Sequence, residues 1–251
     1  MPKYLFNLSI ITVSQNYSDD LFKCLESTKN LENISEHIIV IPEISLSQKK
    51  SLFEIRKNIK FTTDKKKGVY NAINIGIIKS SGKYILLLHG DNILTLDGSK
   101  LIHNQILKDV SSTQFGCFFQ QKNNIRKIFY NYRISKLNLL MGLYPPHPGL
   151  LMKREDIIQL GLYNENYKIC SDFDYYLRIL SNKIIISYLD KSIIISYQGG
   201  ISTNGFISIF NIISERIKIL NYHYSYNKIV ITILILLGYL IKITNNIFYK
   251  D

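Results

Sequence analysis

The sequence predicts an α/β fold with a mostly parallel central sheet and helices on both of its faces. Strand-like and helix-like segments alternate along the first half of the 251-residue chain, which is typical of parallel strands joined by helical crossovers. Short apolar runs such as Tyr84–Leu88 have the length of strands buried on both faces. The chain is long enough for one large domain or two small ones, and it contains no internal repeat.

Local signals place the elements of the first half. Leu5–Val13 is rich in β-forming residues, and Ser18 then offers an N-cap for a helix. The apolar run His37–Ile41 ends at Pro42, as expected for a second buried strand. Four further elements are predicted: a polar helix over Leu46–Lys57, a strand over Ile59–Thr62, a helix over Val69–Ser80 and the strand Tyr84–Leu88.

The second half is predicted to contain strands first and helices last. Phe115–Arg133 has the pattern of strands with a basic hairpin. The remaining predictions are a strand over Leu150–Lys153, a helix over Asp172–Leu180, a strand pair over Ile184–Leu189 and Ile193–Tyr197, and helices from Phe206 to the end.

The composition restricts the classes of partner. Thirty-one Lys and Arg against nineteen Asp and Glu give a net charge of +12. This balance favours an anionic partner, although codon bias in a low-GC genome also produces a Lys-rich chain. The basic residues are scattered and no nucleic-acid-binding motif is present, so no nucleic-acid partner is expected. Three widely spaced cysteines argue against a disulfide framework, and the N-terminus lacks a signal-peptide pattern, so we expect a cytoplasmic location.

The C-terminal segment Ile229–Ile241 carries no charge. As a helix it would be about 20 Å long, which is shorter than the roughly 30 Å hydrocarbon core of a bilayer. A transmembrane span is therefore disfavoured. Two alternatives remain: packing on the domain or on a second subunit as a homo-oligomer, and a helix lying in the membrane surface. In the second case the cationic groups available to lipid headgroups are Lys218, Lys228, Lys242 and Lys250.

The carboxyl ends of the predicted parallel strands define the expected ligand site. Ligands of such sheets bind beyond these ends, so residues 14–16, 42–45, 62–68 and 89–92 are expected to face one crevice. Asp91 directly follows the strand Tyr84–Leu88. Mg²⁺ and Mn²⁺ prefer one or two carboxylates together with phosphate oxygens, so Asp91 could hold a metal–diphosphate group. The alternative is an aspartate that caps a turn.

Several motifs resemble those of family 2 glycosyltransferases, which have the GT-A (nucleotide-diphospho-sugar transferase) fold. Leu88–Asn92 resembles a variant of their Asp-x-Asp metal motif, and Asp64–Gly76 is similar to a stretch of the bacterial polysaccharide members. Further resemblances occur in the same order as in the family, at Ser81–Tyr84, His147–Arg154, Gly161–Tyr167, Ser171–Tyr175 and Gln198–Ser202.

The resemblance implies a function. The protein would be an inverting glycosyltransferase of the hexosyl- or N-acetylhexosaminyl-transferase class. Its donor would be a nucleotide-diphosphate sugar, with UDP-sugars favoured. The acceptor would be lipid-linked or a polysaccharide in bacterial surface-glycan synthesis (O-antigen, capsule or lipooligosaccharide). The cofactor would be Mg²⁺ or Mn²⁺. The protein would work at the cytoplasmic face of the inner membrane, with residues 1–205 as the GT-A domain and 206–251 as a helical extension.

The resemblance also implies roles for individual residues. An inverting transfer needs a base that takes the proton of the acceptor hydroxyl. Ser171–Tyr175 resembles the family segment that contains this base, and Asp172 is the residue expected to play that role. The alternatives are an N-cap role for Asp172 and a base at Asp174. His147 is expected to contact the acceptor or a phosphate, or else to pack within its loop. Asp91 is the expected metal ligand, and the expected donor contacts are Val13, Ser14, Glu43, Gly68, Tyr70, Asn71, Asn74, His89 and Gly200.

Several acids of the family pattern are replaced in this chain. Ile41-Pro42-Glu43 stands where the family ends its second strand with Asp and Gly, and Lys66 occupies a usual acidic position. The other replacements are Asn71, His89 and Asn92. These departures support an alternative hypothesis, a catalytically impaired GT-A-like module that acts as a scaffold for a membrane or a synthesis complex.

Overall fold

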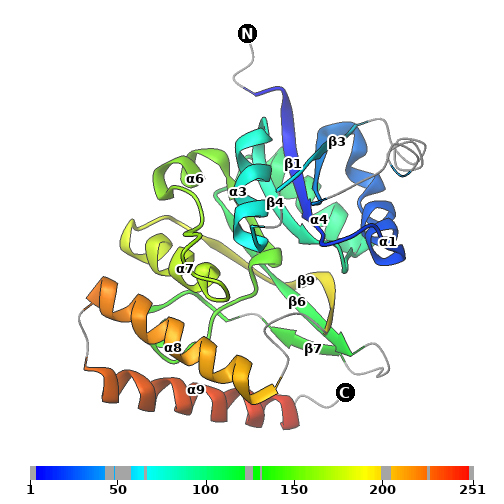
Figure 1. The fold of residues 1–251 in the computed structure, drawn as a ribbon. Helices are drawn as coiled ribbons and strands as arrows, with labels where there is room; N and C mark the ends of the chain where they lie inside the picture. Colours follow the sequence, from blue (N-terminus) through cyan, green and yellow to red (C-terminus); the bar gives the residue numbers. More distant parts are fainter. Residues whose placement is uncertain are drawn as a thin grey trace.

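The computed structural model describes residues 4–42, 48, 58–64, 67–121, 127–130, 132–198, 205–224 and 227–248. These residues form a twisted sheet with helices packed against both of its faces (Figure 1). The predicted fold class is thus confirmed. The polar helix expected over Leu46–Lys57 lies outside the described residues, apart from Gln48.

The described strands form one sheet in the order β3-β2-β1-β4-β8-β6-β9-β5, with β7 beside β6. β1 to β4, β6 and β9 share one direction, whereas β5, β7 and β8 run antiparallel to their neighbours. The strands are β1 Phe6–Val13, β2 Ser35–Val40, β3 Ile59–Thr62, β4 Gly82–His89, β5 Asn92–Leu94, β6 Thr113–Gln121, β7 Lys127–Tyr130, β8 Leu150–Lys153 and β9 Ser187–Gln198.

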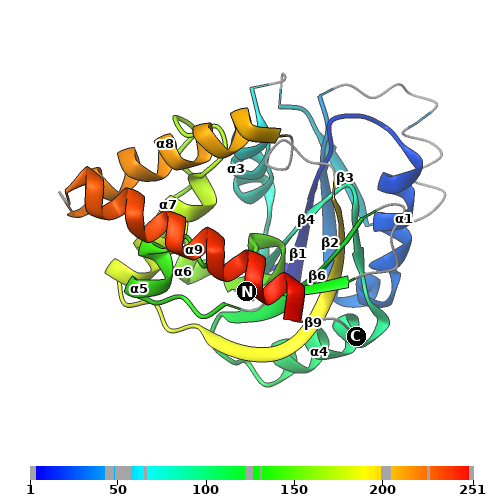
Figure 2. The same cartoon turned by 90° about the horizontal axis from the view of Figure 1, so that it is seen from below.

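The central strands are apolar along most of their length because both faces of the sheet are covered. Side chains of β1 alternate between two hydrophobic clusters: Leu8 and Ile10 join one, and Ile11 and Val13 join the other. Figures 1 and 2 show α1 and α4 on one face and α3, α6 and α7 on the other. The helices are α1 Asp19–Ser27, α3 Val69–Lys79, α4 Leu96–Leu107, α5 Lys136–Leu140, α6 Arg154–Leu160 and α7 Ser171–Ser181, with 3-10 turns at Lys29–Ile34 and His147–Gly149.

The register of the parallel strands brings their carboxyl ends level with one another. Val13 at the end of β1 pairs with Val40 of β2 and with His89 of β4. The segments that follow β1, β2 and β4 therefore leave the sheet at the same edge, as the sequence predicted. This edge carries the candidate site.

The predicted strand pair near the C-terminal third is wrong. Instead of two strands over Ile184–Leu189 and Ile193–Tyr197, the structure has the one strand β9, which runs parallel to β6. Leu189 pairs with Phe115 and Ser192 with Gly116, so a bulge accommodates the two charged residues between them. Asp190 and Lys191 are exposed at this bulge, which explains why they resemble a turn in the sequence.

The chain ends in two helices, α8 (Gly205–Tyr224) and α9 (Lys228–Phe248), which lie side by side at the lower end of the molecule in Figure 1. Ile212 and Ile219 of α8 and Ile231 and Ile235 of α9 belong to the same hydrophobic cluster as α7. Gly238 lets α9 approach α5 closely, since a Cβ there would lie 1.8 Å from the Met141 carbonyl oxygen. Among the helices that the structure describes, none has the length and apolar character needed to span a bilayer.

Candidate active site

The candidate site begins where β1 and β4 end next to each other. The Gly90 amide donates to the Val13 carbonyl (2.9 Å), and the Ser14 amide donates to the Val40 carbonyl (3.1 Å). A Cβ at Gly90 would lie 2.7 Å from Ser14 Oγ, so only glycine fits this close approach. Val13, Ser14 and His89, three of the expected donor contacts, are thereby brought together.

The turn after β4 fixes the carboxylate of Asp91. Asn92 is fully buried, and its Oδ1 accepts a hydrogen bond from the His89 amide (2.9 Å). Its Nδ2 donates to Asp91 Oδ1 (3.2 Å) and to Ser196 Oγ on β9 (3.1 Å). An aspartate at position 92 could not donate these two bonds when ionised. The replacement of an acid by Asn92 therefore has a structural role: it holds the one remaining carboxylate in place.

His89 and His147 form a hydrogen-bonded pair above this turn. Their Nε2 atoms lie 2.9 Å apart, and their ring centroids 4.9 Å apart. Burial lowers the pKa of His89 to about 3, with a further contribution from His147 that Asp172 only partly offsets. His89 is therefore neutral at pH 7, and one N–H lies between the two rings.

Asp172 lies on the other side of His147. Its Oδ2 is 3.8 Å from His147 Nδ1, and its Oδ1 is 3.4 Å from the Tyr70 hydroxyl and accepts from the Phe173 amide (2.8 Å). The side chain is 17% exposed. The N-cap residue of α7 is Cys170, so Asp172 stands within the first turn and is not the cap.

Asp174, the competing candidate for the base, faces the helical layer. Its carboxylate accepts from Arg178 Nε (2.9 Å) and lies 2.9 Å from His223 Nε2 on α8. The side chain is only 5% exposed. Both carboxylate oxygens are engaged in buried contacts, so of the two aspartates only Asp172 keeps partial access to solvent.

The residues expected to contact the donor from α3 are mostly bound to protein groups. Gly68 precedes the helix with φ of 108°, a conformation that favours glycine. The Tyr70 hydroxyl donates to the Ile169 carbonyl (2.6 Å). Asn71 Nδ2 donates to Glu165 (2.8 Å), and buried Asn74 donates to Glu165 (2.8 Å) and to the Tyr163 carbonyl (2.9 Å). The side-chain amides of Asn71 and Asn74 thus bind α3 to the turn 161–167. Glu43 and Gly200 lie outside the described residues.

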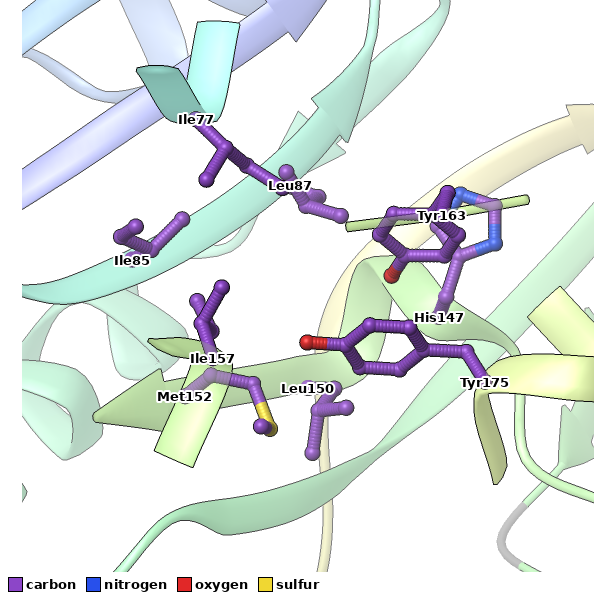
Figure 3. A pocket seen from close by; sticks show the side chains of 9 residues that line it. All are labelled: Ile77, Ile85, Leu87, His147, Leu150, Met152, Ile157, Tyr163 and Tyr175. Atoms are coloured by element: carbon purple, nitrogen blue, oxygen red, sulfur yellow. The ribbon is translucent and has the colours of Figure 1, made fainter. Parts of the chain in front are cut away.

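An aromatic stack supports His147 from behind. Tyr163 stacks between Tyr70 (centroids 5.9 Å apart) and Tyr175 (4.3 Å), and its ring meets His147 edge-on at 6.2 Å. Next to the stack is a cavity of about 10 Å³, which is barely the volume that one water needs (Figure 3). The cavity is therefore no substrate site. Its lining residues are Ile77, Ile85, Leu87, His147, Leu150, Met152, Ile157, Tyr163 and Tyr175.

Sequence reasoning missed two glutamates that organise this site, Glu165 and Glu215. Glu165 binds both Asn71 and Asn74. Glu215 accepts hydrogen bonds from the amides of residues 168–170, immediately before α7. The only available signal for Glu215 was its isolation, because it is the one acid in the segment Gly205–Tyr224.

A divalent cation would find one protein carboxylate at the end of β4. Among the residues that the structure describes, no group of three or more His, Cys, Asp or Glu side chains is placed to hold a metal. Mg²⁺ at nucleotide sites nevertheless needs only one or two carboxylates, because phosphate oxygens and waters complete its coordination. Asp91 fits this requirement, and cation binding here would depend on a bound diphosphate.

The sheet order, the level carboxyl ends of β1 to β4 and the carboxylate after β4 define a protein of the GT-A fold class. Solved structures confirm this fold. TarS from S. aureus aligns with a TM-score of 0.65 at 12% identity, covering 86% of this chain and 40% of TarS. The mannosyltransferase PcManGT from Pyrobaculum calidifontis, in complex with GDP-Man and Mn²⁺, aligns with a TM-score of 0.62 at 11% identity, covering 94% of this chain and 71% of that chain.

Sequence comparison also finds glycosyltransferases. The chain is 23% identical over 155 residues to a PGL/p-HBAD biosynthesis glycosyltransferase of Mycobacterium tuberculosis, and the match covers 55% of each chain. A protein of the same description from Mycobacterium bovis matches equally well. The chain spans about half the length of the curated relatives it matches. No family model matches the chain. The resemblance to GT-A glycosyltransferases is thus confirmed, at low identity.

Proposed function

We propose that the protein is an inverting glycosyltransferase that moves one sugar from a nucleotide-diphosphate sugar to a lipid-linked or saccharide acceptor. The observation that carries the proposal is the placement of two carboxylates around one histidine pair. Asp91 follows His89 at the end of β4, and Asp172 lies 3.8 Å from His147. One carboxylate is available for the diphosphate side of the reaction and the other for the acceptor.

The donor assignment is supported by the solved relatives. Structures of TarS have been determined with UDP and with UDP-GlcNAc, the latter aligning with a TM-score of 0.62, and PcManGT was solved with GDP-Man and Mn²⁺. We favour a uridine nucleotide, and a hexose or an N-acetylhexosamine as the transferred sugar. The donor would lie at the carboxyl ends of β1 and β4, which Val13 and His89 form. Ser14 and Gly68 are further donor contacts in this proposal.

In the proposed reaction, Asp172 removes the proton of the acceptor hydroxyl as its oxygen attacks the anomeric carbon. The bond from that carbon to the diphosphate oxygen breaks, and the electron pair leaves with the nucleoside diphosphate. The Tyr70 hydroxyl lies 3.4 Å from Oδ1 of Asp172, and His147 Nδ1 lies 3.8 Å from its Oδ2. His147 would contact the acceptor in this reaction. A cation held by Asp91 would act as a Lewis acid on the diphosphate oxygens.

The acceptor assignment is supported by the outer face of α9. Its exposed side chains form an apolar row: Ile229, Val230, Ile233, Leu236, Leu237 and Leu240. Leu137 of the neighbouring α5 is also 60% exposed, and Arg133, Lys136 and Lys218 are exposed cations on adjoining segments. An apolar face with basic residues nearby matches an anionic membrane surface, so we propose peripheral association with the inner membrane. If flotation showed no binding to anionic vesicles, or equal binding by a Leu236→Glu/Leu240→Glu variant, this part of the proposal would be wrong.

Calorimetric titration with UDP, GDP, CDP and dTDP, with and without Mn²⁺, tests the donor site. We expect one nucleotide to bind only with the metal, and Asp91→Ala to abolish that binding. The exposed Asp97→Ala variant on α4 is the matched control, and it should bind like the wild type. Absence of binding to all four nucleotides would contradict the proposal.

That negative result would favour a second function, a non-catalytic scaffold of GT-A fold. The specific observation behind it is the engagement of Asn71 and Asn74 with Glu165 and Tyr163, which leaves fewer polar groups for a nucleotide. A scaffold would tolerate Asp91→Ala and Asp172→Asn in a cellular complementation assay, but would lose function when the apolar face of α9 is made polar.

A further inference from the structure

Glu215, in the middle of α8, binds the backbone just before α7. Its Oε1 accepts a hydrogen bond from the Lys168 amide (2.9 Å), and its Oε2 accepts from the amides of Ile169 (3.0 Å) and Cys170 (2.9 Å). Successive N–H groups that converge on one carboxylate form an anion-binding concavity of the main chain. Cys170 makes no side-chain cap for α7. Glu215, 45 residues further along the chain than Cys170, instead binds the amides of the segment that leads into this helix.

The same segment is held on its other side by α3. The Tyr70 hydroxyl donates to the Ile169 carbonyl (2.6 Å), so the peptide groups of Ile169 are held between Tyr70 and Glu215. Tyr70 also lies 3.4 Å from Asp172 Oδ1. Two helices that are far apart in the sequence, α3 and α8, therefore bind the backbone that leads to Asp172.

The neighbour of Glu215 contacts the residue on the other side of Asp172. Arg216 is 5% exposed, and its guanidinium lies over the rings of Phe173 (5.6 Å) and Tyr144 (5.1 Å). Two adjacent residues of α8 thus bind the chain before and after Asp172. Displacement of α8 would move the carboxylate relative to His147.

We infer that Glu215 is a positioning residue for Asp172, and that α8 is therefore part of the catalytic unit. The inference rests on the proposed function, in which Asp172 is the base. If residues 206–251 served only to attach the protein to a membrane, α8 would not be needed for turnover of a water-soluble substrate without a membrane. The inference predicts that α8 is needed for this turnover.

The test compares the wild type, Glu215→Ala, Glu215→Gln and the exposed same-helix control Lys218→Ala, all in the full chain. Three quantities are measured: donor affinity by calorimetry, kcat and KM for nucleoside diphosphate release from the donor, and hydrogen exchange of the amides of residues 168–170. We expect Glu215→Ala to speed amide exchange and to lower kcat by about 100-fold, the effect of a misplacement of about 1 Å, while donor affinity and KM stay within about threefold.

Glu215→Gln keeps one carbonyl acceptor and should recover part of kcat, and Lys218→Ala should behave like the wild type. Unchanged kcat in Glu215→Ala would overturn the inference, whether or not the amides exchange faster, and so would a loss that appears only in KM. If Glu215→Ala does not fold, the Gln variant decides by the same criteria. A wild type that binds no nucleotide would instead refute the proposed function itself, and with it this inference.

Discussion

The two ends of the same parallel strands are used differently. At the amino ends, Glu36 is fully buried, and its carboxylate accepts hydrogen bonds from Ser9 Oγ (2.7 Å), the Ser81 amide (2.5 Å), Ser81 Oγ (2.8 Å) and Lys60 Nζ (2.5 Å). At the carboxyl ends, Asp172 is partly exposed and accepts one short hydrogen bond, from the Phe173 amide. The first carboxylate has a full set of donors, whereas the second keeps capacity for a ligand.

The titration behaviour of the two ends differs in the same way. Burial alone would raise the pKa of Glu36, yet its bonds to Lys60, Ser9 and Ser81 bring the pKa below the ordinary value. At the other end, burial and His147 lower the pKa of His89 to about 3, and the carboxylate of Asp172 offsets this only in part. The amino ends are arranged for stability, and the carboxyl ends carry an electrostatic cost that is typical of functional sites.

The largest expected effect is on turnover. Asp172→Asn keeps the shape of the side chain but removes the base, so kcat should fall by about 10³-fold, within the usual range for acid–base catalysis. The urea midpoint should change little, because Asp172 is partly exposed. Initial rates of nucleoside diphosphate release measure the first quantity, and equilibrium unfolding measures the second. A kcat within threefold of the wild type would show that Asp172 is not the base.

A substitution at the amino ends should have the opposite profile. Glu36→Ala leaves four donors without their acceptor, and we expect the free energy of unfolding to fall by about 3 kcal/mol. Because the folded pKa lies below the ordinary 4.5, this contribution is present above pH 4.5 and is lost as the pH falls below it. Urea unfolding at pH 7 and pH 4 checks both statements. Similar stability of wild type and variant at pH 7 would contradict the assignment.

His89 should make the protein sensitive to mild acid. Its folded pKa of about 3 lies below the ordinary 6.5, so the unfolded chain binds the additional proton between these values and stability falls as the pH drops. At pH 5 the loss amounts to about 2 kcal/mol, at 1.36 kcal/mol per pKa unit. The difference in unfolding free energy between pH 7 and pH 5 should shrink by this amount in His89→Asn. An identical pH dependence in both proteins would be the contrary result.

The smallest expected effect concerns the contact between β1 and β4. Gly90→Ala would place a Cβ 2.7 Å from Ser14 Oγ, and we expect it to lower stability by about 1–2 kcal/mol. Adding Ser14→Gly should restore part of the loss, because it removes the atoms that the new Cβ meets. Thermal unfolding of the two variants measures this coupling. If the double variant is no more stable than Gly90→Ala alone, the contact with Ser14 is not the cause of the lost stability.

Local sequence signals predicted most strands and helices. The features that the sequence did not reveal depend on contacts between residues far apart in the chain. Ile59–Thr62 and Leu150–Lys153 are strands at the predicted residues, since short apolar runs leave few alternatives. β9 was predicted as two strands because its bulge carries two charged residues in sequence.

Within the site, the motifs indicated Asp172 and His147, which the structure places 3.8 Å apart. Asn74 stays a predicted donor contact, and the structure adds a bond to the backbone of Tyr163, 89 residues away, that the sequence did not reveal. Glu215 was missed for the same reason, because its partners are amides and amides carry no sequence signal.

The most direct test of the central claim is nucleoside diphosphate release from a panel of nucleotide sugars in the presence of Mn²⁺. The assay compares the wild type with Asp172→Asn at the carboxyl ends and with Glu36→Gln at the amino ends. We predict release from one donor by the wild type and by folded Glu36→Gln, and loss of release in Asp172→Asn. Equal release by wild type and Asp172→Asn, or no release from any donor, would contradict the account.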